Sequence, residues 1–282
     1  MHIDTHAHVN FNAYKDDADE VIKRSLSEDV FMINVGSQYS TSKRAVEMAN
    51  RYETGVWAAV GLYPVQLQKR SFEYQDDYEL PQEEIKTIGE EFDYKKYLEL
   101  AKDEKVVAIG EVGLDYKHFE EGDDIQNLIS LQKNIFLEFI NIANEVKKPL
   151  IIHCWGNYAE TKAYDDLLEI LQNNPVKKAG VIHSFMGSRK IAKKFIELGY
   201  KIGMNGVITY SESYDKLIRE MELKDIVLET DCPYLTPVPH KGERNEPLHV
   251  RLVAKKIAQI KETSLEELQK MTLHNSQELF DL

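Results

Sequence analysis

The sequence is short of cysteine and of long apolar runs. It has two cysteines, Cys154 and Cys232, among 282 residues; two thiols so far apart cannot build a disulfide scaffold, and we expect both to be reduced. No apolar run approaches the roughly 18 residues that a membrane-spanning helix needs. The first ten residues, MHIDTHAHVN, lack the basic start and apolar stretch of a secretory signal. We therefore expect a cytoplasmic protein with no membrane partner.

Positive charge is also scarce. There are 35 Lys and Arg against 48 Asp and Glu, which gives a formal net charge of −13. This balance argues against a broad basic face that holds duplex nucleic acid or an anionic membrane. The deficit is uneven, because residues 73–104 contain 12 acidic and 4 basic side chains. An anionic substrate would therefore need a local source of positive charge.

Eight short runs rich in Val, Ile and Ala alternate with longer segments in which apolar residues recur every three or four positions. The first pattern is typical of buried parallel strands and the second of amphipathic helices, so together they predict βα units. The predicted strands are residues 2–5, 30–35, 56–60, 106–109, 150–153, 180–183, 201–204 and 226–229. The predicted helices are residues 16–27, 42–51, 94–103, 125–146, 158–172, 188–198, 214–221, 247–260 and 264–280.

Eight such units in a chain of this length favour a TIM-like (β/α)8 barrel. An open doubly wound sheet has the same count and stays an alternative, although its Rossmann version is disfavoured because no G-x-G-x-x-G follows the first strand. No repeat or flexible linker divides the chain, so we expect one domain over residues 1–282. Residues 66–93 are long, polar and acidic, which indicates an excursion or lid. Ser264 followed by Glu267 predicts a capping box at the last helix.

Six potential metal ligands fall at or near the carboxyl ends of the predicted strands, where this fold places its active sites. The first two are separated by one residue in an extended segment, so they share one face. A lone His or acid at a strand end is more often structural, but six on the same predicted face indicate a metal centre. The set is His6, His8, Glu111, His153, His183 and Asp231.

Six ligands are too many for one open catalytic site. Two divalent ions about 3.5–4 Å apart that share a carboxylate would use them all, and we expect Glu111 to be the bridge. Strand neighbourhood in a closed barrel gives the rest of the assignment: one ion takes His6, His8 and Asp231, and the other takes His153 and His183. Imidazoles with carboxylates suit Zn, Mn, Fe or Ni. The expected cofactors are two divalent ions, with Mg, Mn or Zn as candidates.

Other residues near the strand ends are weaker candidates. Tyr63 and Trp155 follow the third and fifth strands, where an aromatic ring could stack on a base or sugar, although packing under a lid explains them equally well. Three further histidines are left out of the ligand set, because His2 begins a strand, His118 lies in a charged loop and His274 lies in the last helix.

A Pro- and Gly-rich loop, TPVPHKGERNEP, follows the eighth strand. It contains His240, Arg244 and Asn245, and it could hold a phosphate through its basic groups or simply form a turn. The two cysteines each neighbour a predicted ligand. Adjacent residues of a strand point to opposite faces, so we expect Cys154 and Cys232 to be structural.

The motifs resemble, in order and spacing, those of the TatD-like metal-dependent deoxyribonucleases of the amidohydrolase superfamily. The resemblance runs from end to end and is carried by IDTHAH, VAIGEVGLDY, KPLIIH, VIHSFMGS, VLETDCPYL, GERNEP and HNSQELF. It implies a TIM-like barrel whose divalent-metal centre hydrolyses phosphodiester bonds of DNA, often as a 3′→5′ exonuclease on single strands. It also implies the same six ligands.

Several positions depart from the common pattern of that family. Tyr63 stands where the family usually has His, and Trp155 stands where it usually has Arg. Ser184 and Met186 stand where it usually has Cys and Ser. All of these positions lie outside the ligand set. The departures therefore concern the substrate contacts more than hydrolysis itself.

The mechanism that we expect is attack of a metal-activated water on a DNA phosphodiester, with Asp231 as general base and Glu111 as the catalytic bridge. Two carboxylates, neutral imidazoles and two divalent ions leave a local positive charge, which suits single-stranded or terminal DNA in a pocket. An alternative is an amidohydrolase-type enzyme that uses the same dinuclear site on an amide, ester or lactone. Such enzymes often carry a carboxylated lysine at strand four, where this chain has Glu111. A non-catalytic metal-binding scaffold is the remaining alternative.

Overall fold

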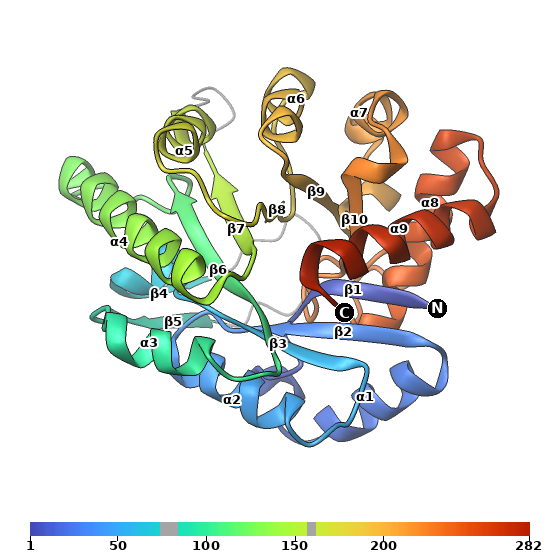
Figure 1. Ribbon diagram of the computed structural model, residues 1–282, viewed down its shortest axis with the longest axis horizontal. Coiled ribbons are helices and arrows are strands. Elements are labelled where there is room, and N and C mark those ends of the chain that lie inside the picture. Colours follow the sequence, from blue (N-terminus) through green and yellow to red (C-terminus); the bar gives the residue numbers. More distant parts are fainter. Residues whose placement is uncertain (74–83, 157–161) are drawn as a thin grey trace.

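A barrel of eight parallel strands forms the centre of the molecule (Figure 1). The computed structural model describes residues 1–73, 84–156 and 162–282. Neighbours in the sheet follow the order of the chain. The strands are β1 (His2–Ala7), β2 (Val30–Val35), β3 (Val56–Val60), β6 (Val106–Asp115), β7 (Leu150–Trp155), β8 (Val181–Ile182), β9 (Lys201–Met204) and β10 (Ile226–Leu228).

The first and last strands meet just beyond their carboxyl ends. The Asp231 N–H donates to the carbonyl of His6 at 2.8 Å, and the His8 N–H donates to the carbonyl of Cys232 at 2.9 Å. An isolated parallel bridge pairs Ala7 with Cys232. The barrel prediction is therefore confirmed over the open sheet. Because the closing bonds involve the backbone of three predicted ligands, closure also sets the position of those ligands.

Helices cover the outside of the barrel and alternate with its strands (Figure 1). None of the described helices combines the length and the apolar character that a membrane span requires. The α-helices are α1 (Ala18–Ser27), α2 (Tyr39–Ala49), α3 (Tyr94–Ala101), α4 (Ile125–Val146), α5 (Lys162–Asn173), α6 (Arg189–Glu197), α7 (Asp215–Glu220), α8 (Val250–Lys261) and α9 (Leu265–Phe280). Short 3-10 turns lie at Asn12–Tyr14, Pro64–Leu67, Gly206–Thr209, Glu212–Tyr214, Leu223–Asp225 and Pro247–His249.

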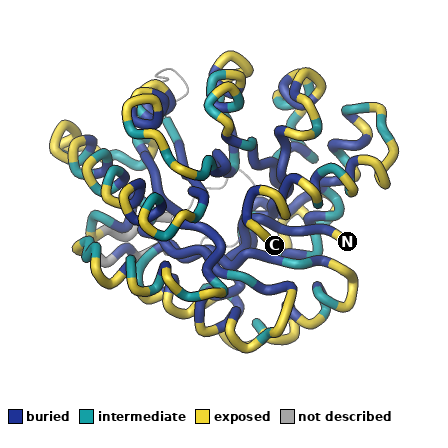
Figure 2. Tube along the Cα trace, in the orientation of Figure 1, coloured by how far each residue is buried: buried dark blue, intermediate teal, exposed yellow. Residues whose placement is uncertain are grey.

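The strands are the most buried part of the fold, as the dark blue tubes of Figure 2 show. Side chains alternate between two apolar clusters: Ile33 and Val35 of β2 belong to a cluster made almost entirely of strand residues, whereas Met32 packs under the helices. Leu279 and Phe280, at the end of α9, join the strand cluster. Since alternate strand residues face the inside of a barrel, this cluster fills the lumen, and the polar residues gather at the carboxyl ends.

β6 is longer and less regular than the sequence predicts. Its pairing with β7 shifts in register between Ile109 and Val112, so Glu111 lies in an irregularity inside the strand rather than after it. The neighbouring backbone is very close, because a Cβ added to Gly61 would lie 2.5 Å from the carbonyl carbon of Gly110. Glycine at Gly61 thus makes room for the backbone that carries Glu111.

The chain between β3 and β6 leaves the main sheet. β4 (Lys69–Glu73) pairs antiparallel with β5 (Glu84–Ile88) as a separate two-stranded sheet. Residues 74–83, in the middle of the predicted excursion 66–93, lie outside the described residues, so a lid function stays a prediction. Residues 158–161 of the helix predicted at 158–172 also lie outside them, and α5 is described from Lys162.

The cap of α9 is half of the predicted capping box. Ser264 Oγ accepts from the Glu267 N–H at 3.0 Å, but the Glu267 carboxylate accepts from the Thr263 hydroxyl instead of the Ser264 backbone. We expect Ser264→Ala to lower the free energy of unfolding by about 1 kcal/mol, since a backbone N–H loses its partner. Urea denaturation measures the change, with Ser40→Ala as the exposed control, expected to stay within about 0.5 kcal/mol. Equal effects of both substitutions would contradict the assignment.

Candidate metal centre

Two histidines at the end of β1 face each other. His6 and His8 lie on the same side of an extended backbone, both are buried, and their Nε2 atoms are 3.0 Å apart. Nδ1 of His8 lies 2.8 Å from the carbonyl of Val35. A carbonyl can only accept, so Nδ1 holds the proton and the Nε2 lone pair of His8 is directed toward His6. An imidazole held in this way is typical of a metal ligand.

Glu111 lies at the centre of the cluster. Its Oε1 is 2.9 Å from His153 Nδ1 and 3.1 Å from His183 Nε2. Its Oε2 is 3.7 Å from His6 Nε2. Burial by itself would raise the pKa of this carboxyl, but the surrounding imidazoles, His183 foremost, hold the pKa of Glu111 well below its ordinary value. The carboxylate is therefore charged, and each of its oxygens faces a different part of the cluster.

Asp231 approaches the pair from the loop after β10. Its Oδ1 lies 3.2 Å from His8 Nε2 and 3.6 Å from His6 Nε2. Its backbone adopts a left-handed conformation with φ of 58°, which is uncommon outside glycine but which Asp tolerates better than most residues. Burial would raise its pKa, but the bond to His8 and the nearby His183 lower the pKa of Asp231 below its ordinary value.

Two triads of donor atoms result, and each could hold a cation. His6, Glu111 and His183 form one, while His6, His8 and Asp231 form the other, with the donor atoms of each within 4.8 Å of one another. Imidazole nitrogens and carboxylate oxygens are the donors that Zn and Mn sites use. Buried lone pairs converging in this way repel one another unless protons or a cation lie between them. The donor set thus fits divalent metal.

The structure also shows where the predicted grouping differs from the geometry. The group His6, His8 and Asp231 is one of the two triads. The other triad contains His6 with Glu111 and His183, whereas the prediction placed His153 with His183. His153 contacts the cluster through Glu111. All six predicted ligands therefore meet in one place, although their division between two ions stays a prediction.

Asp115 is a buried residue of the centre that sequence reasoning missed. Its Oδ2 lies 2.9 Å from His153 Nε2 and 2.9 Å from His118 Nδ1, and it accepts from the Tyr63 hydroxyl at 3.0 Å. Gln132 of α4 brackets the backbone of Asp115 with bonds of 2.8 and 2.9 Å. His118, which the sequence analysis leaves out of the ligand set, belongs to neither donor triad but lies beside the centre through its contact with Asp115. Asp115 orients His153 through the nitrogen that faces away from Glu111.

Glu229 plays the corresponding part for another ligand. Its Oε1 lies 3.5 Å from His183 Nδ1 and accepts from the Ser184 N–H at 2.5 Å. Gly203 makes room for this carboxylate, because a Cβ there would lie 2.4 Å from Glu229 Oε2. Both of these acids lie an even number of residues from a ligand: Asp115 is four residues after Glu111, and Glu229 is two residues before Asp231. This spacing was the only signal that could have pointed to them. Acids near the ends of strands are too common for such a spacing to identify a functional residue.

The two aromatic candidates lie beside the cluster. The ring of Tyr63 meets the ring of His153 edge to face, with centroids 4.8 Å apart. Trp155 is half-buried and meets the His118 ring edge to face at 5.2 Å. Tyr63 thus lies next to His153 and Trp155 next to His118, and both of these histidines contact Asp115. The contact of Tyr63 and Trp155 with a substrate stays a prediction.

In the loop after β10, the three residues predicted to contact substrate make contacts within the protein. Arg244 is paired with Asp17 and lies over the Tyr14 ring at 4.4 Å. Asn245 is fully buried and donates to the carbonyls of Thr230 and Tyr234. A separate contact in this loop stacks His240 on His249 at 4.6 Å. These contacts hold the loop that follows Asp231, and a phosphate contact of the three residues stays a prediction.

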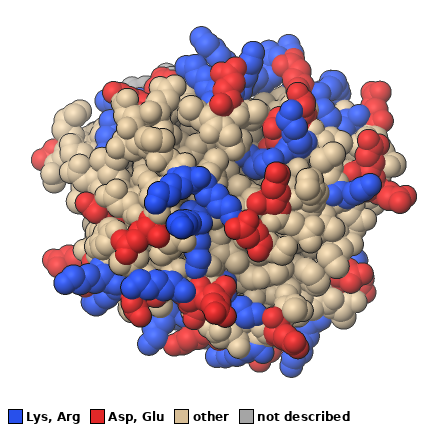
Figure 3. Space-filling model, viewed as in Figure 1, with Lys and Arg blue, Asp and Glu red and all other residues tan. Residues whose placement is uncertain are grey.

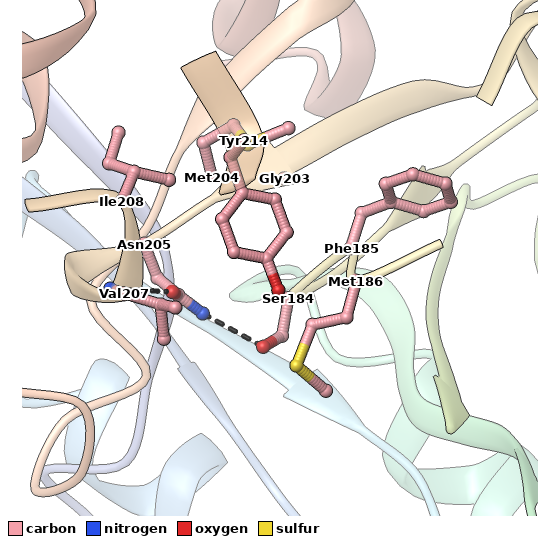
Figure 4. A pocket seen from close by; sticks show the side chains of 9 residues that line it. All are labelled: Ser184, Phe185, Met186, Gly203, Met204, Asn205, Val207, Ile208 and Tyr214. Atoms are coloured by element: carbon pink, nitrogen blue, oxygen red, sulfur yellow. Dashed lines mark hydrogen bonds between the residues drawn. The ribbon is translucent and has the colours of Figure 1, made fainter. Parts of the chain in front are cut away.

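A small pocket of about 10 Å³ borders the centre on the side of β8 and β9 (Figure 4). Ser184, one residue after His183, accepts a hydrogen bond from the Asn205 amide at 2.8 Å. Met186 and Tyr214 line the same pocket. Its volume has room for about one water molecule. Ser184 and Met186, which depart from the family pattern, are half-buried and line this pocket beside the centre, and their contact with a substrate stays a prediction.

Both cysteines are structural, as predicted. Cys154 and Cys232 are buried and free, and burial raises the pKa of both thiols, that of Cys232 to about 12. A thiol with so high a pKa is protonated at neutral pH and is a poor metal ligand.

The contacts of Asp115 predict that it controls metal affinity. Asp115→Asn replaces the carboxylate oxygen shared by His153, His118 and Tyr63. We expect affinity for Mn²⁺ or Zn²⁺ to fall roughly 10–100-fold, since the imidazole loses the anion that orients it. Competition with a chromophoric chelator measures the loss. Tyr63→Phe removes one of the three bonds and should weaken binding much less; an unchanged affinity of a folded Asp115→Asn protein would refute the role.

The pKa of His153 predicts the pH response of the metal-free protein. Burial by itself would lower this pKa, but the bonds to Asp115 and Glu111 raise it from 6.5 to about 9. A histidine whose pKa rises on folding stabilises the fold fully below pH 6.5, and this stabilisation is lost as the pH rises through 9. For protein kept metal-free by a chelator, we expect the free energy of unfolding to fall by roughly 3 kcal/mol as the pH rises from below 6.5 to above 9.

Urea unfolding at pH 6 and pH 10 measures this effect. His153→Gln cannot gain the proton, so its stability should change less over the same range. A variant that loses as much stability as the parent protein would show that other groups cause the fall.

Comparison with known proteins agrees with this geometry. Residues 3–281 match the family described as TatD related DNase. A protein of Bacillus subtilis named uncharacterized metal-dependent hydrolase YabD is 34% identical over 284 residues, which cover 99% of this chain and 99% of that protein.

Solved structures show the same fold. The crystal structure of YjjV, a TatD homologue from Escherichia coli, has a TM-score of 0.80 at 28% identity and covers 100% of this chain and 98% of its own. A TatD family hydrolase from Entamoeba histolytica has a TM-score of 0.79 at 21% identity, with 99% and 97% covered, which supports the fold alone. Because the family model matches residues 3–281 and the Bacillus subtilis protein is 34% identical over 99% of this chain, the chain belongs to the TatD related DNase family.

Proposed function

We propose that this chain cleaves phosphodiester bonds of DNA with two divalent cations and removes nucleotides from the 3′ ends of single-stranded or terminal substrates. Its family makes it a metal-dependent hydrolase that acts on ester bonds. The observation that carries the finer proposal is the central place of Glu111, whose Oε1 faces His153 and His183 while its Oε2 faces His6. Two adjoining cation sites are the arrangement suited to in-line displacement at phosphorus.

The contacts of each ligand support a division between two cations. His6, His8 and Asp231 would hold one, and His153 and His183 would hold the other. Glu111 would bridge them, because one of its oxygens faces His153 and His183 while the other faces His6. Bound divalent ions, with Mg, Mn and Zn as candidates, supply Lewis-acid polarisation of the phosphate and lower the pKa of water.

Asp231 is suited to move the proton. Its carboxylate is 14% exposed against 8% for Glu111, so it is the more open of the two acids. Its lowered pKa keeps it ionised at neutral pH. It can accept a proton from the attacking water and return it to the leaving oxygen of the sugar. The backbone bond from Asp231 to His6 keeps the carboxylate beside the histidines during both transfers.

Charge supports a terminal substrate over a duplex. The chain has a net charge of −13, which opposes long-range capture of a polyanion. Two divalent ions would offset the carboxylates of the centre and offer a single phosphate direct coordination over short range. The adjoining rings of Tyr63 and Trp155 are the side chains that we propose for stacking on a terminal base.

A substrate panel tests the proposal against a small-molecule hydrolase. Single-stranded oligonucleotides labelled at the 3′ or 5′ end, duplex DNA, RNA, a cyclic amide and a lactone are each incubated with Mg²⁺, Mn²⁺ or Zn²⁺. We expect stepwise shortening of single-stranded DNA from its 3′ end. Turnover of the lactone or cyclic amide with intact DNA would overturn the proposal in favour of the alternative.

Asp231→Asn separates proton transfer from folding. We expect turnover to fall roughly 10²–10⁴-fold, because the amide cannot accept the proton, while circular dichroism and most of the metal content are retained. Asp16→Asn, at an exposed position, is the control and should keep full activity. Near-normal activity of metal-loaded Asp231→Asn would remove Asp231 from the role of base.

A further inference from the structure

α6 carries a concentration of positive charge in this acidic protein. Its nine residues, RKIAKKFIE, contain four basic side chains and one acid. The apolar face, which includes Ile191 and Phe195, is buried, so the basic side chains lie toward solvent. Figure 3 shows Lys and Arg side chains gathered over α6 at the top of the view. We call Arg189, Lys190, Lys193 and Lys194 the α6 basic face.

The short connection from β8 keeps this face near the metal centre. Five residues separate His183 from the start of α6, so the first turn lies within about 20 Å of that ligand. The connection is tied down, because the Ser184 N–H donates to Glu229 and the Phe185 N–H donates to the carbonyl of Gly203. A helix that follows a barrel strand begins at the edge where that strand ends. The α6 basic face therefore borders the same edge as the ligands.

Contacts within the described part of the fold account for only two of these four charges. Arg189 and Lys193, like Lys190 and Lys194, are four residues apart, and like charges at that spacing repel. Cations in the first turn also oppose the helix dipole. Arg189 pairs with Glu220 of α7 and Lys193 lies 3.9 Å from Glu197, whereas Lys190 and Lys194 have no ion pair with the residues that the structure describes. An anionic partner would relieve this repulsion.

A second basic helix shows the contrast. α8 has four basic side chains and no acid, but two of them act within the fold. Arg251 pairs with Glu28, and Lys261 donates to the carbonyls of Arg219 and Met221. α8 thus offers a matched control in Lys255 and Lys256, which have the same charge at another place.

We propose that the α6 basic face binds the phosphates of a single-stranded nucleic acid whose end lies in the metal centre. This inference rests on the proposed function, since a strand cut at its end must leave the centre across the surrounding edge. A row of cations spaced along a helix suits a repeating phosphate backbone, and such contacts give affinity without reading sequence. The face would hold the strand while nucleotides are removed in turn.

Charge reversal tests the inference on the full-length, metal-loaded protein. Lys190→Glu/Lys193→Glu is compared with Lys255→Glu/Lys256→Glu, which makes the same change of net charge on α8. Fluorescence anisotropy measures binding of a phosphorothioate 20-mer, which resists cleavage, between 50 and 200 mM salt. We expect the α6 variant to bind about 10-fold more weakly, with a slope of log affinity against log salt that is smaller by about 1.4 for two lost phosphate contacts. The α8 variant should bind as the parent protein does.

Hydrolysis gives a second measurement that separates the face from the centre. The α6 variant should cleave a dinucleotide at the parental rate and lose efficiency on the 20-mer. Equal binding of the 20-mer by all three proteins, or an equal loss in the α8 variant, would overturn the inference. So would binding of anionic lipid vesicles that depends on Lys190 and Lys193 when oligonucleotide binding does not. Failure of the parent protein to cleave any nucleic acid would instead overturn the proposed function, because anisotropy tests the face without catalysis.

Discussion

The buried charge of Glu111 is the constraint on which the centre depends. A carboxylate removed from water costs several kcal/mol unless opposite charge or hydrogen-bond donors surround it. In this molecule the imidazoles come from different strands: His6 from β1, His153 from β7 and His183 from the end of β8. They can surround Glu111 only when the sheet has curled into a barrel. The bonds that join β1 to the segment after β10 complete the curl and bring Asp231 into place.

A second layer of contacts holds the ligands in the orientation that metal binding needs. The carbonyl of Val35 sets the tautomer of His8, and Asp115 and Glu229 face the outer nitrogens of His153 and His183. Ligands held before the metal arrives lose little conformational entropy when it binds. The layer also reaches outward, since Asp115 contacts Tyr63 and His118 at the edge of the centre. Changes in these outer residues would thus be transmitted to a ligand.

Electrostatics divides the molecule into regions of opposite character. The acidic excess lies largely in residues 73–104 of the sequence, whereas α6 is basic, and the centre itself holds carboxylates that are surrounded by imidazoles. Repulsion over long range and attraction over short range favour small or terminal anions over broad duplex surfaces. A basic helix beside the centre adds a place for the following phosphates of a strand.

The barrel and the types of donor residue in its centre could be predicted from local patterns in the sequence. Period-two and period-3.6 patterns are local, so eight strands and their helices can be recognised without knowing what each packs against. The residue types of the ligands, and the placement of His6 and His8 on one face of a strand, can likewise be read from local sequence. Tertiary structure alone decided what each side chain meets: the irregular strand around Glu111, the three bonds on Asp115, and the pairing of Arg244 with Asp17. These contacts join residues distant in the chain, and no local period encodes which long-range partner a polar group will find.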